Sequence, residues 1–358
     1  MLVLNNEEIS AIIDMPTCIA AMETAYRGMS EGRGVNRRRS DTLVATRPAE
    51  SGGIYSLKSM DGVSPDLGVG AMRINSDIIT YPAIGGQRRR VKVPAAPGER
   101  YTGLVLLFSS DTGEPLAIFP DGVVQRMRVG AANGLATKYL ARADTPRVGI
   151  IGSGWQAGSQ LMAMTSVRNV EQIRCFSPNE ANCKAFATKI SPLIGVDIEP
   201  VASMETAIED VDVALCATSS IEPFFQADWV GPGLHISSIK RSELHPDAVR
   251  KADRIVIHSR DGAPLLTMAA GVEPPAADRP DGGALLDVLD FATVPLLADL
   301  VAGKTPARQS DEEATCFINN IGMGFQFAVI GKVVYDRALQ TGAGRELPTE
   351  WFTQKEHP

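Results

Sequence analysis

The sequence is poor in the residues that mark several common classes of protein. Its 358 residues include only four histidines and five cysteines, and neither type is spaced as a metal site requires. The cysteines are Cys18, Cys175, Cys183, Cys216 and Cys316. Because no C-x-x-C pair occurs, we expect free, mostly buried thiols in a reducing compartment, which indicates a cytoplasmic protein without a bound metal.

An excess of basic charge is also lacking. Lys and Arg number 35 against 42 Asp and Glu, a net charge of −7, so the chain has no electrostatic footprint for nucleic acid. The first residues, Met1–Glu8, lack the basic start and the apolar stretch of a signal peptide. No apolar run is long enough to cross a bilayer. The length and the 44% hydrophobic content instead indicate a globular protein of two domains.

A glycine-rich stretch, Gly152-Ser-Gly-Trp-Gln-Ala157, follows the apolar run Val148–Ile151. Gly152, Gly154 and Ala157 occupy the three small positions of the dinucleotide fingerprint G-x-G-x-x-G/A. The first allows a sharp turn, the second lets the backbone approach a pyrophosphate, and the third lets the helix lie close to the strand. Because the stretch joins a predicted strand to a predicted helix, it predicts a dinucleotide site.

The pattern of apolar residues predicts two kinds of region. Residues 34–120 alternate as strands, with 53–60 and 68–75 among them, separated by Gly, Pro and Asp, after helices near Asn6 and over 15–29. A helix with one apolar face is predicted over 121–142. From 147 to about 310, strands and helices alternate, which indicates a Rossmann-type, doubly wound parallel sheet. We therefore expect an α+β substrate-binding and dimerisation domain over 1–125, completed by 311–358 with a helix over 311–340, and an NAD(P)-binding domain over 126–310. The basic segment 82–100 reads as a solvated loop, or else as a lid or partner contact.

The chain resembles the ornithine cyclodeaminase/mu-crystallin family through an ordered set of motifs. These are Thr112-Gly-Glu-Pro-Leu-Ala117, Arg128-Val-Gly-Ala131, Lys138-Tyr-Leu-Ala141, the glycine turn, and Gly233-Leu-His-Ile followed by Ser242-Glu-Leu244. The resemblance implies a homodimer that shares a sheet of its first domain. It also implies chemistry on an imine or an α-amino acid with a nicotinamide cofactor.

The chain departs from the family at three places. Arg73 stands where the family usually has a lysine, and the loop after residue 239 lacks the Asp of the cyclodeaminases. Phe327 stands where the family often has Asp in its final helix. The missing acids argue against cyclodeamination and favour simple reduction or oxidation.

Basic residues of the first domain are the predicted substrate ligands. By resemblance, Arg73 and Arg128 bind a substrate carboxylate, as does Arg39, because a guanidinium fork holds a carboxylate in a fixed orientation. Each could instead form a surface or interface ion pair. Lys58 is the predicted proton donor, with an ordered water as the alternative, since a buried lysine beside other cations loses its proton readily and arginine does not. We predict catalytic roles for Lys58 and Arg73, and a substrate contact for Asn320.

The predicted cofactor ligands lie where strands of the parallel sheet end. They are Gly152, Ser153, Gly154, Gln156, Ala157, Ser177, Asn179, Thr218, Ser219, Ser238 and Ile239. The second strand ends in Phe176-Ser-Pro-Asn179, without the acid that would bind the ribose of NAD. We therefore expect NADP, with NAD as the alternative. His235 and Cys216 read as core residues.

These features predict an NAD(P)H-dependent reductase or dehydrogenase of a small α-imino or α-amino acid. One alternative is an ornithine or lysine cyclodeaminase with bound NAD. The other is a non-catalytic protein, like mu-crystallin, that binds NADPH or a small molecule, because fold alone does not fix function.

Overall fold

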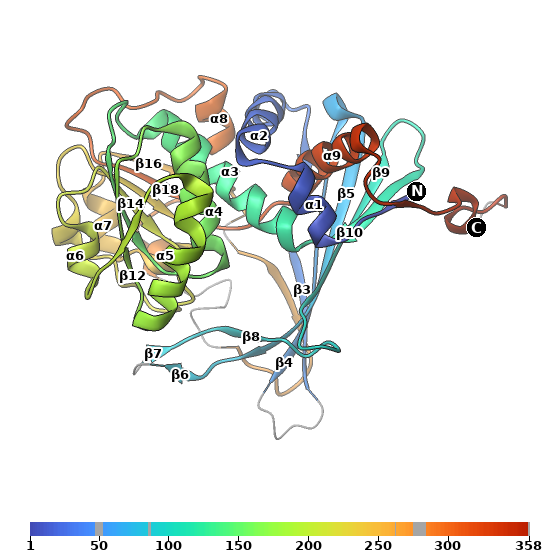
Figure 1. Ribbon diagram of the computed structural model, residues 1–358, viewed down its shortest axis with the longest axis horizontal. Coiled ribbons are helices and arrows are strands. Elements are labelled where there is room, and N and C mark those ends of the chain that lie inside the picture. Colours follow the sequence, from blue (N-terminus) through green and yellow to red (C-terminus); the bar gives the residue numbers. More distant parts are fainter. Residues whose placement is uncertain (47–52, 85–86, 262, 275–283, 357–358) are drawn as a thin grey trace.

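A computed structural model describes residues 1–46, 53–84, 87–261, 263–274 and 284–356, and its strands form two large sheets (Figure 1). The first, of ten strands, has the order β17-β3-β4-β5-β9-β10-β1-β19, with β2 beside β4 and β8 beside β5. Its strands are β1 Leu2–Val3, β2 Val35–Asn36, β3 Ser40–Ala45, β4 Ile54–Ser64, β5 Val69–Thr80, β8 Val91–Val93, β9 Thr102–Ser109, β10 Pro115–Pro120, β17 Leu265–Met268 and β19 Arg345–Glu346.

The second sheet has seven strands, all parallel, in the order β13-β12-β11-β14-β15-β18-β16. They are β11 Arg147–Ile151, β12 Gln172–Phe176, β13 Ile198–Pro200, β14 Val213–Cys216, β15 His235–Ser238, β16 Arg254–Ile257 and β18 Thr315–Ile318. Strand β14 is buried throughout, as expected of a parallel strand covered by helices on both faces. The predicted fold class, a Rossmann-type sheet with a second α+β part, is confirmed.

The helices are α1 Asn6–Ile12, α2 Met15–Ser30, α3 Gly122–Leu140, α4 Trp155–Val167, α5 Glu180–Ile194, α6 Met204–Ile208, α7 Pro246–Lys251, α8 Leu297–Val301 and α9 Gly324–Thr341. Helix α3 lies between the two sheets and packs against α2, α4 and α9 (Figure 1). It is buried continuously from Met127 to Thr137, rather than on the one apolar face predicted for residues 121–142. This helix therefore connects the two halves of the molecule rigidly.

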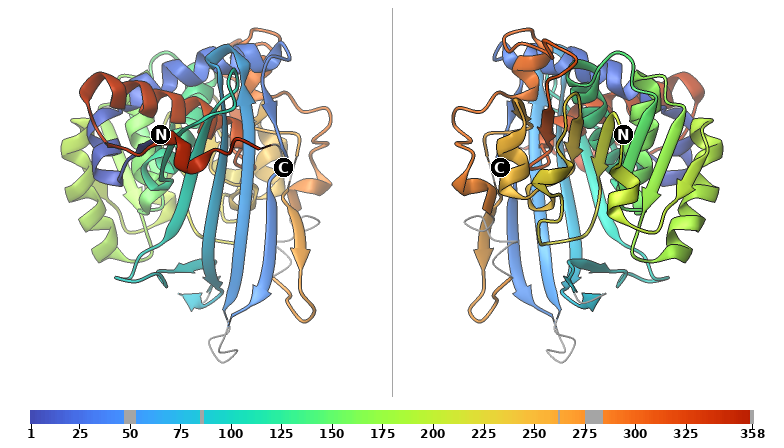
Figure 2. Two further views of the ribbon diagram at one scale, coloured as in Figure 1. Left: turned by 90° about the vertical axis from the view of Figure 1, so that its right-hand side faces the viewer. Right: turned by 90° about the vertical axis from the view of Figure 1, so that its left-hand side faces the viewer.

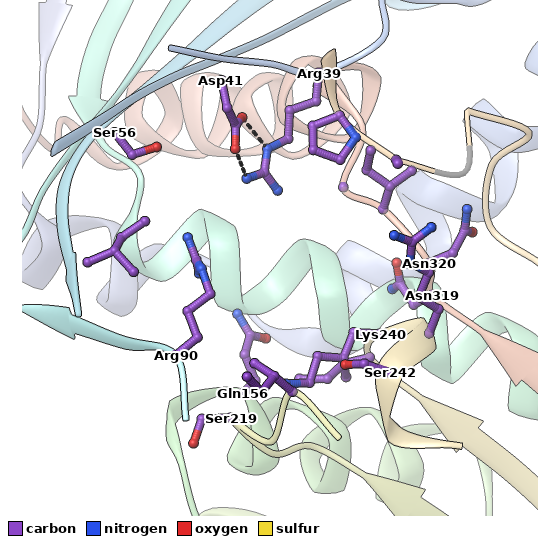
Figure 3. A pocket seen from close by; sticks show the side chains of 18 of the residues that line it. Arg39, Asp41, Ser56, Arg90, Gln156, Ser219, Lys240, Ser242, Asn319 and Asn320 are labelled. Carbon is purple, nitrogen blue, oxygen red and sulfur yellow. Dashed lines mark hydrogen bonds and ion pairs between the residues drawn. The ribbon is translucent and has the colours of Figure 1, made fainter. Parts of the chain in front are cut away.

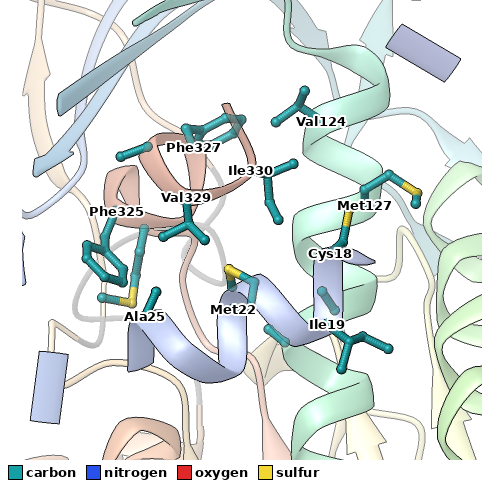
Figure 4. Close-up of a cluster of buried hydrophobic side chains, with 14 of the residues drawn as sticks. Cys18, Ile19, Met22, Ala25, Val124, Met127, Phe325, Phe327, Val329 and Ile330 are labelled. Carbon is teal, nitrogen blue, oxygen red and sulfur yellow. The ribbon is translucent and has the colours of Figure 1, made fainter. Parts of the chain in front are cut away.

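A hydrophobic cluster joins α2, α3 and α9 beneath the first sheet (Figure 4). Met22, Val124 and Phe327 are fully buried in it, and each such side chain contributes roughly 1.5–3 kcal/mol. In β5 the buried and half-buried positions alternate strictly. The buried positions include Arg73, Asn75 and Asp77, so the inner face of this sheet carries charge as well as core.

Two predicted segments differ from the structure. Residues 311–340 are not helical throughout, since β18 lies inside the seven-stranded sheet and α9 begins only at Gly324. Four buried residues in an apolar run do not distinguish a strand from a helix by periodicity. The predicted domain boundary at 310 therefore does not follow the two sheets. Strand β18, after the boundary, joins the second sheet, and β17, before it, joins the first.

The second difference is the basic segment 82–100, which contains strands where a loop was predicted. They are β6 Ala83–Ile84, β7 Gln87–Arg88 and β8, which pairs antiparallel with β5. Residues 85–86 of this segment lie outside the described residues. The charged composition favours a loop, but β8 forms because it pairs with the end of β5. Tertiary contacts of this kind override local composition.

Candidate active site

The turn after β11 has the geometry that dinucleotide binding requires. Gly152 has φ +116°, and a Cβ there would lie 2.2 Å from the carbonyl oxygen of Ala217, so only glycine fits. Gly154 precedes α4, and a Cβ at this position would meet no atom within 4 Å. The space above Gly154 is therefore open, and the first turn of α4 offers its backbone N–H groups to a phosphate.

A cleft of about 570 Å³ lies over this turn. We call it the nucleotide cleft, and the predicted residues that line it are Gly152, Ser153, Gly154, Gln156, Ser177, Thr218, Ser219 and Ile239. Of the remaining predictions, Ala157 is buried beneath the turn, and the Asn179 side chain accepts a hydrogen bond that caps α5. Ser238 is buried and donates to Glu243 at 2.9 Å.

A second cavity of about 420 Å³ lies between the sheets, and we call it the cationic cavity. Its charged lining residues are Arg39, Asp41, Arg90, Arg128, Lys240 and Arg241. Asp41 is thus the only acid among the described lining residues, and it pairs with Arg39. In Figure 3, Arg39 and Asp41 approach from one side, Arg90 from the strand β8 side, and Lys240 and Ser242 from the opposite wall. Such a cavity suits an anionic ligand.

The two cavities adjoin. Gln156, Thr218, Ser219 and Ile239 line both, so a ligand in the cationic cavity would lie next to one in the nucleotide cleft. These residues follow the carboxyl ends of β11, β14 and β15, where open α/β sheets bind ligands. This edge of the sheet is therefore shared by the two cavities.

Arg128 is the buried cation of this junction. Its guanidinium donates to the side-chain oxygens of Gln326 at 2.7 Å and Gln125 at 2.9 Å, and lies 5.3 Å from the ring centroid of Phe327. All of these partners are neutral, and among the described residues Arg128 has no ion pair. Burial, and then Arg73, lower the pKa of Arg128 to about 9, so the group stays charged at neutral pH.

A chain of hydrogen bonds fixes the Gln326 that holds Arg128. Gln326 donates to the Tyr26 hydroxyl at 3.1 Å, and that hydroxyl lies 2.6 Å from Nε2 of His258. Nδ1 of His258 lies 2.7 Å from the carbonyl oxygen of Ile321, which makes Nδ1 the donor and Nε2 the acceptor. Burial lowers the pKa of His258 to about 4, so the ring is neutral. The hydrogen bonds therefore run in one donor-to-acceptor direction, from Gln326 through Tyr26 to His258. Sequence reasoning missed Tyr26, His258 and Gln326, because no local motif joins them.

Arg73 lies beside Phe327, outside the lining of the cavity. It donates to Asp121 at 2.6 Å and 2.8 Å, and its guanidinium lies 5.6 Å from the ring centroid of Phe327. Two buried guanidinium groups thus approach this ring, and of the two only Arg73 has an acidic partner among the described residues. Arg73 does not line the cationic cavity, whereas the predicted ligands Arg39, Arg128 and Asn320 do.

Asn320 lines the cavity but uses its amide to hold the chain. Its side-chain oxygen accepts from the backbone N–H groups of His258 and Ser259, each at 3.1 Å, and its nitrogen donates to the carbonyl of Ser259 at 2.7 Å. Its local role is therefore to fix the end of β16 beside the cavity.

Lys58 is buried directly across the sheet from Asp41. Its amine lies 2.6 Å from Asp77, which also pairs with Lys92 at 2.9 Å. Burial, and then the charges of Arg90 and Arg39, lower the pKa of Lys58. Lys58 does not line the cavity, but Ser56 on the same face of β4 does, and its buried hydroxyl has no hydrogen-bond partner in the described part of the chain.

Glu243 ties together the loops that line both cavities. Its fully buried carboxylate accepts from the Thr218 N–H at 2.6 Å, the Thr218 hydroxyl at 2.9 Å and the Ile239 N–H at 3.1 Å. Burial raises the pKa of this carboxyl. The sequence motif Ser242-Glu-Leu244 includes this residue, but no role was predicted for it. Its position in the loop that follows β15 was the available signal.

The described residues contain no group of three or more His, Cys, Asp or Glu side chains arranged to hold a metal ion. No helix among them combines the length and the hydrophobicity that crossing a membrane requires. His235 is buried in the sheet, as predicted; its Nδ1 lies 2.9 Å from Thr315, and its Nε2 has no partner within the described ranges. Cys216 is a buried free thiol, also as predicted.

The fold and the adjoining cavities define a protein with a Rossmann-type sheet and a second, α+β lobe that contributes to the lining of the cationic cavity. The chain belongs to the ornithine cyclodeaminase/mu-crystallin family, which it matches over residues 90–342, so the resemblance predicted from its motifs is confirmed. A Delta(1)-pyrroline-2-carboxylate reductase of Bacillus cereus is 28% identical over 250 residues, covering 68% of this chain and 74% of that protein.

Two solved structures extend the likeness over nearly the whole chain. The Thermococcus litoralis Delta(1)-pyrroline-2-carboxylate reductase in complex with NADH and L-proline has a TM-score of 0.77 and 28% identity, covering 97% of this chain and 100% of that one. An archaeal alanine dehydrogenase dimer with bound NAD has a TM-score of 0.76 and 25% identity, covering 97% and 99%.

Proposed function

We propose that the protein is an NAD(P)H-dependent reductase or dehydrogenase of a small α-imino or α-amino acid. One observation carries this proposal: Arg128, a buried cation without an acidic partner among the described residues, lines a cavity that adjoins the nucleotide cleft. A buried unpaired charge is costly, and a bound carboxylate would offset that cost. Relatives named for reduction of an imine and oxidation of an amino acid support the same chemistry.

Arg128 and Arg39 would hold the substrate carboxylate. Arg73, whose guanidinium lies beside the Phe327 ring, would add positive potential. Ser56 would donate its unpaired hydroxyl to the ligand. The α-carbon would then face the junction lined by Gln156, Thr218 and Ile239. A nicotinamide cofactor bound in the cleft would supply or accept the hydride.

Lys58 would hold the proton that the imine nitrogen gains on reduction. Its amine is buried beside Asp77, and Asp41 lies directly across the sheet toward the cavity. The test is Lys58→Met, which should lower kcat far more than it raises KM. An unaltered kcat would remove Lys58 from the mechanism.

The cleft fits the phosphates of a dinucleotide, and we propose NADP as the preferred form. No acid lines the cleft among the described residues, so nothing there would repel a 2′-phosphate, and Ser177 can donate to it. Activity with NADPH should exceed activity with NADH at equal concentration. The reverse order would overturn this preference.

A homodimer would cover the outer face of the first sheet. This face of the sheet is turned toward the viewer in Figure 2, left. It includes four exposed hydrophobic residues of β4 and β9 that alternate with buried positions: Leu57, Val63, Leu104 and Phe108. A second copy is the proposed occupant because a similar structure is a dimer. Light scattering should show a dimer that Leu104→Asp dissociates, whereas Leu193→Asp, at an exposed position of α5, should leave it intact.

A substrate screen tests the proposed reaction. Keto acids with ammonia or methylamine, and cyclic imines, should oxidise NADPH, read as loss of its absorbance. Ammonia release from ornithine or lysine without net cofactor turnover would identify a cyclodeaminase instead. NADPH binding without turnover of any of these compounds would identify a non-catalytic binding protein.

A further inference from the structure

The basic segment that runs from β6 to β8 is bonded to both halves of the molecule. Strand β8 pairs with β5 of the first sheet, in register Thr80 with Val91. Two residues earlier, Arg89 forms an antiparallel bridge with Ser220, in the loop that follows β14 of the second sheet. In Figure 1 these strands extend from the first sheet toward the seven-stranded one. We call residues 87–93 the crossing strand.

Three consecutive arginines of the crossing strand have three different environments. Arg88 is exposed, Arg89 lines the nucleotide cleft, and Arg90 lines the cationic cavity. In Figure 3 the Arg90 side chain extends from this strand into the cavity, with Ser219 near its base. Successive side chains of a strand point to opposite faces, so adjacent arginines reach different cavities.

Arg89 is the single charged residue among the described residues that line the nucleotide cleft. Its backbone N–H donates to the carbonyl of Pro82 at 3.0 Å, but its Nε is buried without a hydrogen-bond partner in the described part of the chain. A guanidinium carries five donors and suits the oxygens of a phosphate. A buried donor that lacks a partner is costly unless a ligand satisfies it.

We propose that Arg89 binds a phosphate group of the dinucleotide, so that the substrate lobe reaches across to hold the cofactor. The inference rests on the proposed function only in requiring a dinucleotide in the cleft. Both the 2′-phosphate of NADP and the pyrophosphate common to NAD and NADP present this chemistry. Because the crossing strand also carries Arg90, a cofactor held by Arg89 fixes the adjacent cation at the edge of the substrate cavity.

Direct binding to the purified protein tests the proposal. NADPH and NADH are titrated by fluorescence against wild type and Arg89→Ala, with Arg88→Ala as the matched exposed control and thermal unfolding as the check of folding. Arg89→Ala should weaken NADPH binding by about tenfold to a hundredfold, the loss expected for one charge-assisted contact. Arg88→Ala should change neither affinity.

The nucleotide comparison identifies the phosphate. A loss confined to NADPH, matched by loss of 2′,5′-ADP but not 5′-AMP as competitor, identifies the 2′-phosphate; an equal loss for NADPH and NADH identifies the pyrophosphate. Unchanged affinity for both nucleotides in a folded Arg89→Ala would overturn the proposal and leave the proposed function standing. Failure of wild type to bind either nucleotide would overturn the proposed function, and this inference with it.

Discussion

The nucleotide cleft and the cationic cavity adjoin but are built by opposite means. The cleft is lined by glycines, small neutral side chains and backbone N–H groups at the start of α4, with one cation, Arg89, among its described residues. The described lining of the cavity includes five cations and one acid that come from four separate segments of the chain. In the proposed function, phosphates would thus be bound by a local backbone shape, and a carboxylate by charges that the fold must bring together and hold.

The cationic cavity contains a buried charge that its described protein neighbours do not neutralise. Arg73 is balanced by Asp121, whereas Arg128 has only amide and aromatic partners among the described residues. An imbalance of this kind is typical of functional sites, where a group is kept for its ligand rather than for stability. We therefore predict that substitutions in the cationic cavity and in the nucleotide cleft have different effects on activity, on cofactor affinity and on stability.

The largest effect should follow removal of the unbalanced charge. Arg128→Met should lower kcat/KM on the order of a hundredfold to a thousandfold, because a buried ionic contact to the substrate carboxylate is lost. The melting temperature should stay the same or rise, since an unpaired buried charge destabilises the fold. Steady-state kinetics and thermal unfolding of the same preparations measure both effects.

Arg73→Met provides the matched contrast. It leaves the carboxylate of Asp121 buried without its partner, so the free energy of unfolding should fall by about 3–5 kcal/mol. If Arg128→Met instead destabilised the protein as much as Arg73→Met, Arg128 would be a structural residue.

On the backbone side, two glycines of one turn should behave differently. Gly154→Ala adds a methyl group that meets no protein atom, so the melting temperature should hold while the Kd for NADPH rises roughly tenfold. Gly152→Ala instead collides with the carbonyl of Ala217 and should lower the melting temperature. Fluorescence titration and thermal unfolding distinguish the two. A normal Kd in Gly154→Ala would mean that no phosphate approaches this backbone.

The same contrast explains how much the sequence could predict. The nucleotide side follows from residues adjacent in the chain, and eight of the predicted cofactor ligands line the cleft. The cavity side depends on contacts between distant segments, such as Gln326 with Arg128 and Tyr26 with His258. The family resemblance predicted Arg39 and Arg128, which line the cavity. The pairing of Arg73 with Asp121, at positions 48 apart, left no local pattern.

The fold was predicted best for the long elements. The helices α2 and α3 agree with their predicted ranges to within two residues, and the strands β4 and β5 begin within one residue of the prediction but extend four or five residues further. Strands β8 and β18 were missed because each is short and gains its structure from a partner strand, β8 from the end of β5 and β18 from β15, which is distant in sequence. Sheet pairing of this kind depends on neighbours, which a single sequence does not reveal.

A smaller effect, on pH dependence, should connect the cavity to Lys58. Burial, and then Arg90 and Arg39, lower its pKa to about 6, whereas Asp77 opposes the shift. If the protonated amine supplies the proton, reduction should slow as pH rises above about 6. Arg90→Gln removes a charge that disfavours the protonated amine, so this limb should move to higher pH by roughly one unit.

The pH profile of kcat measures the shift, with Arg88→Gln as the control that should leave it in place. Lys58→Met should lack the limb altogether. A limb that persists in Lys58→Met would assign the titration to another group.

The smallest effect should come from Glu243, which supports the cleft and the cavity at once. Its carboxylate holds Thr218 and Ile239, which line both cavities. Glu243→Gln keeps the shape but points an amide N–H₂ at a backbone donor, which should cost about 1–3 kcal/mol of stability. Because one contact positions both loops, the Kd for NADPH and the KM for substrate should rise together by a similar, few-fold factor. A change in only one of them would show that the two loops are positioned independently, and that Glu243 serves a single ligand.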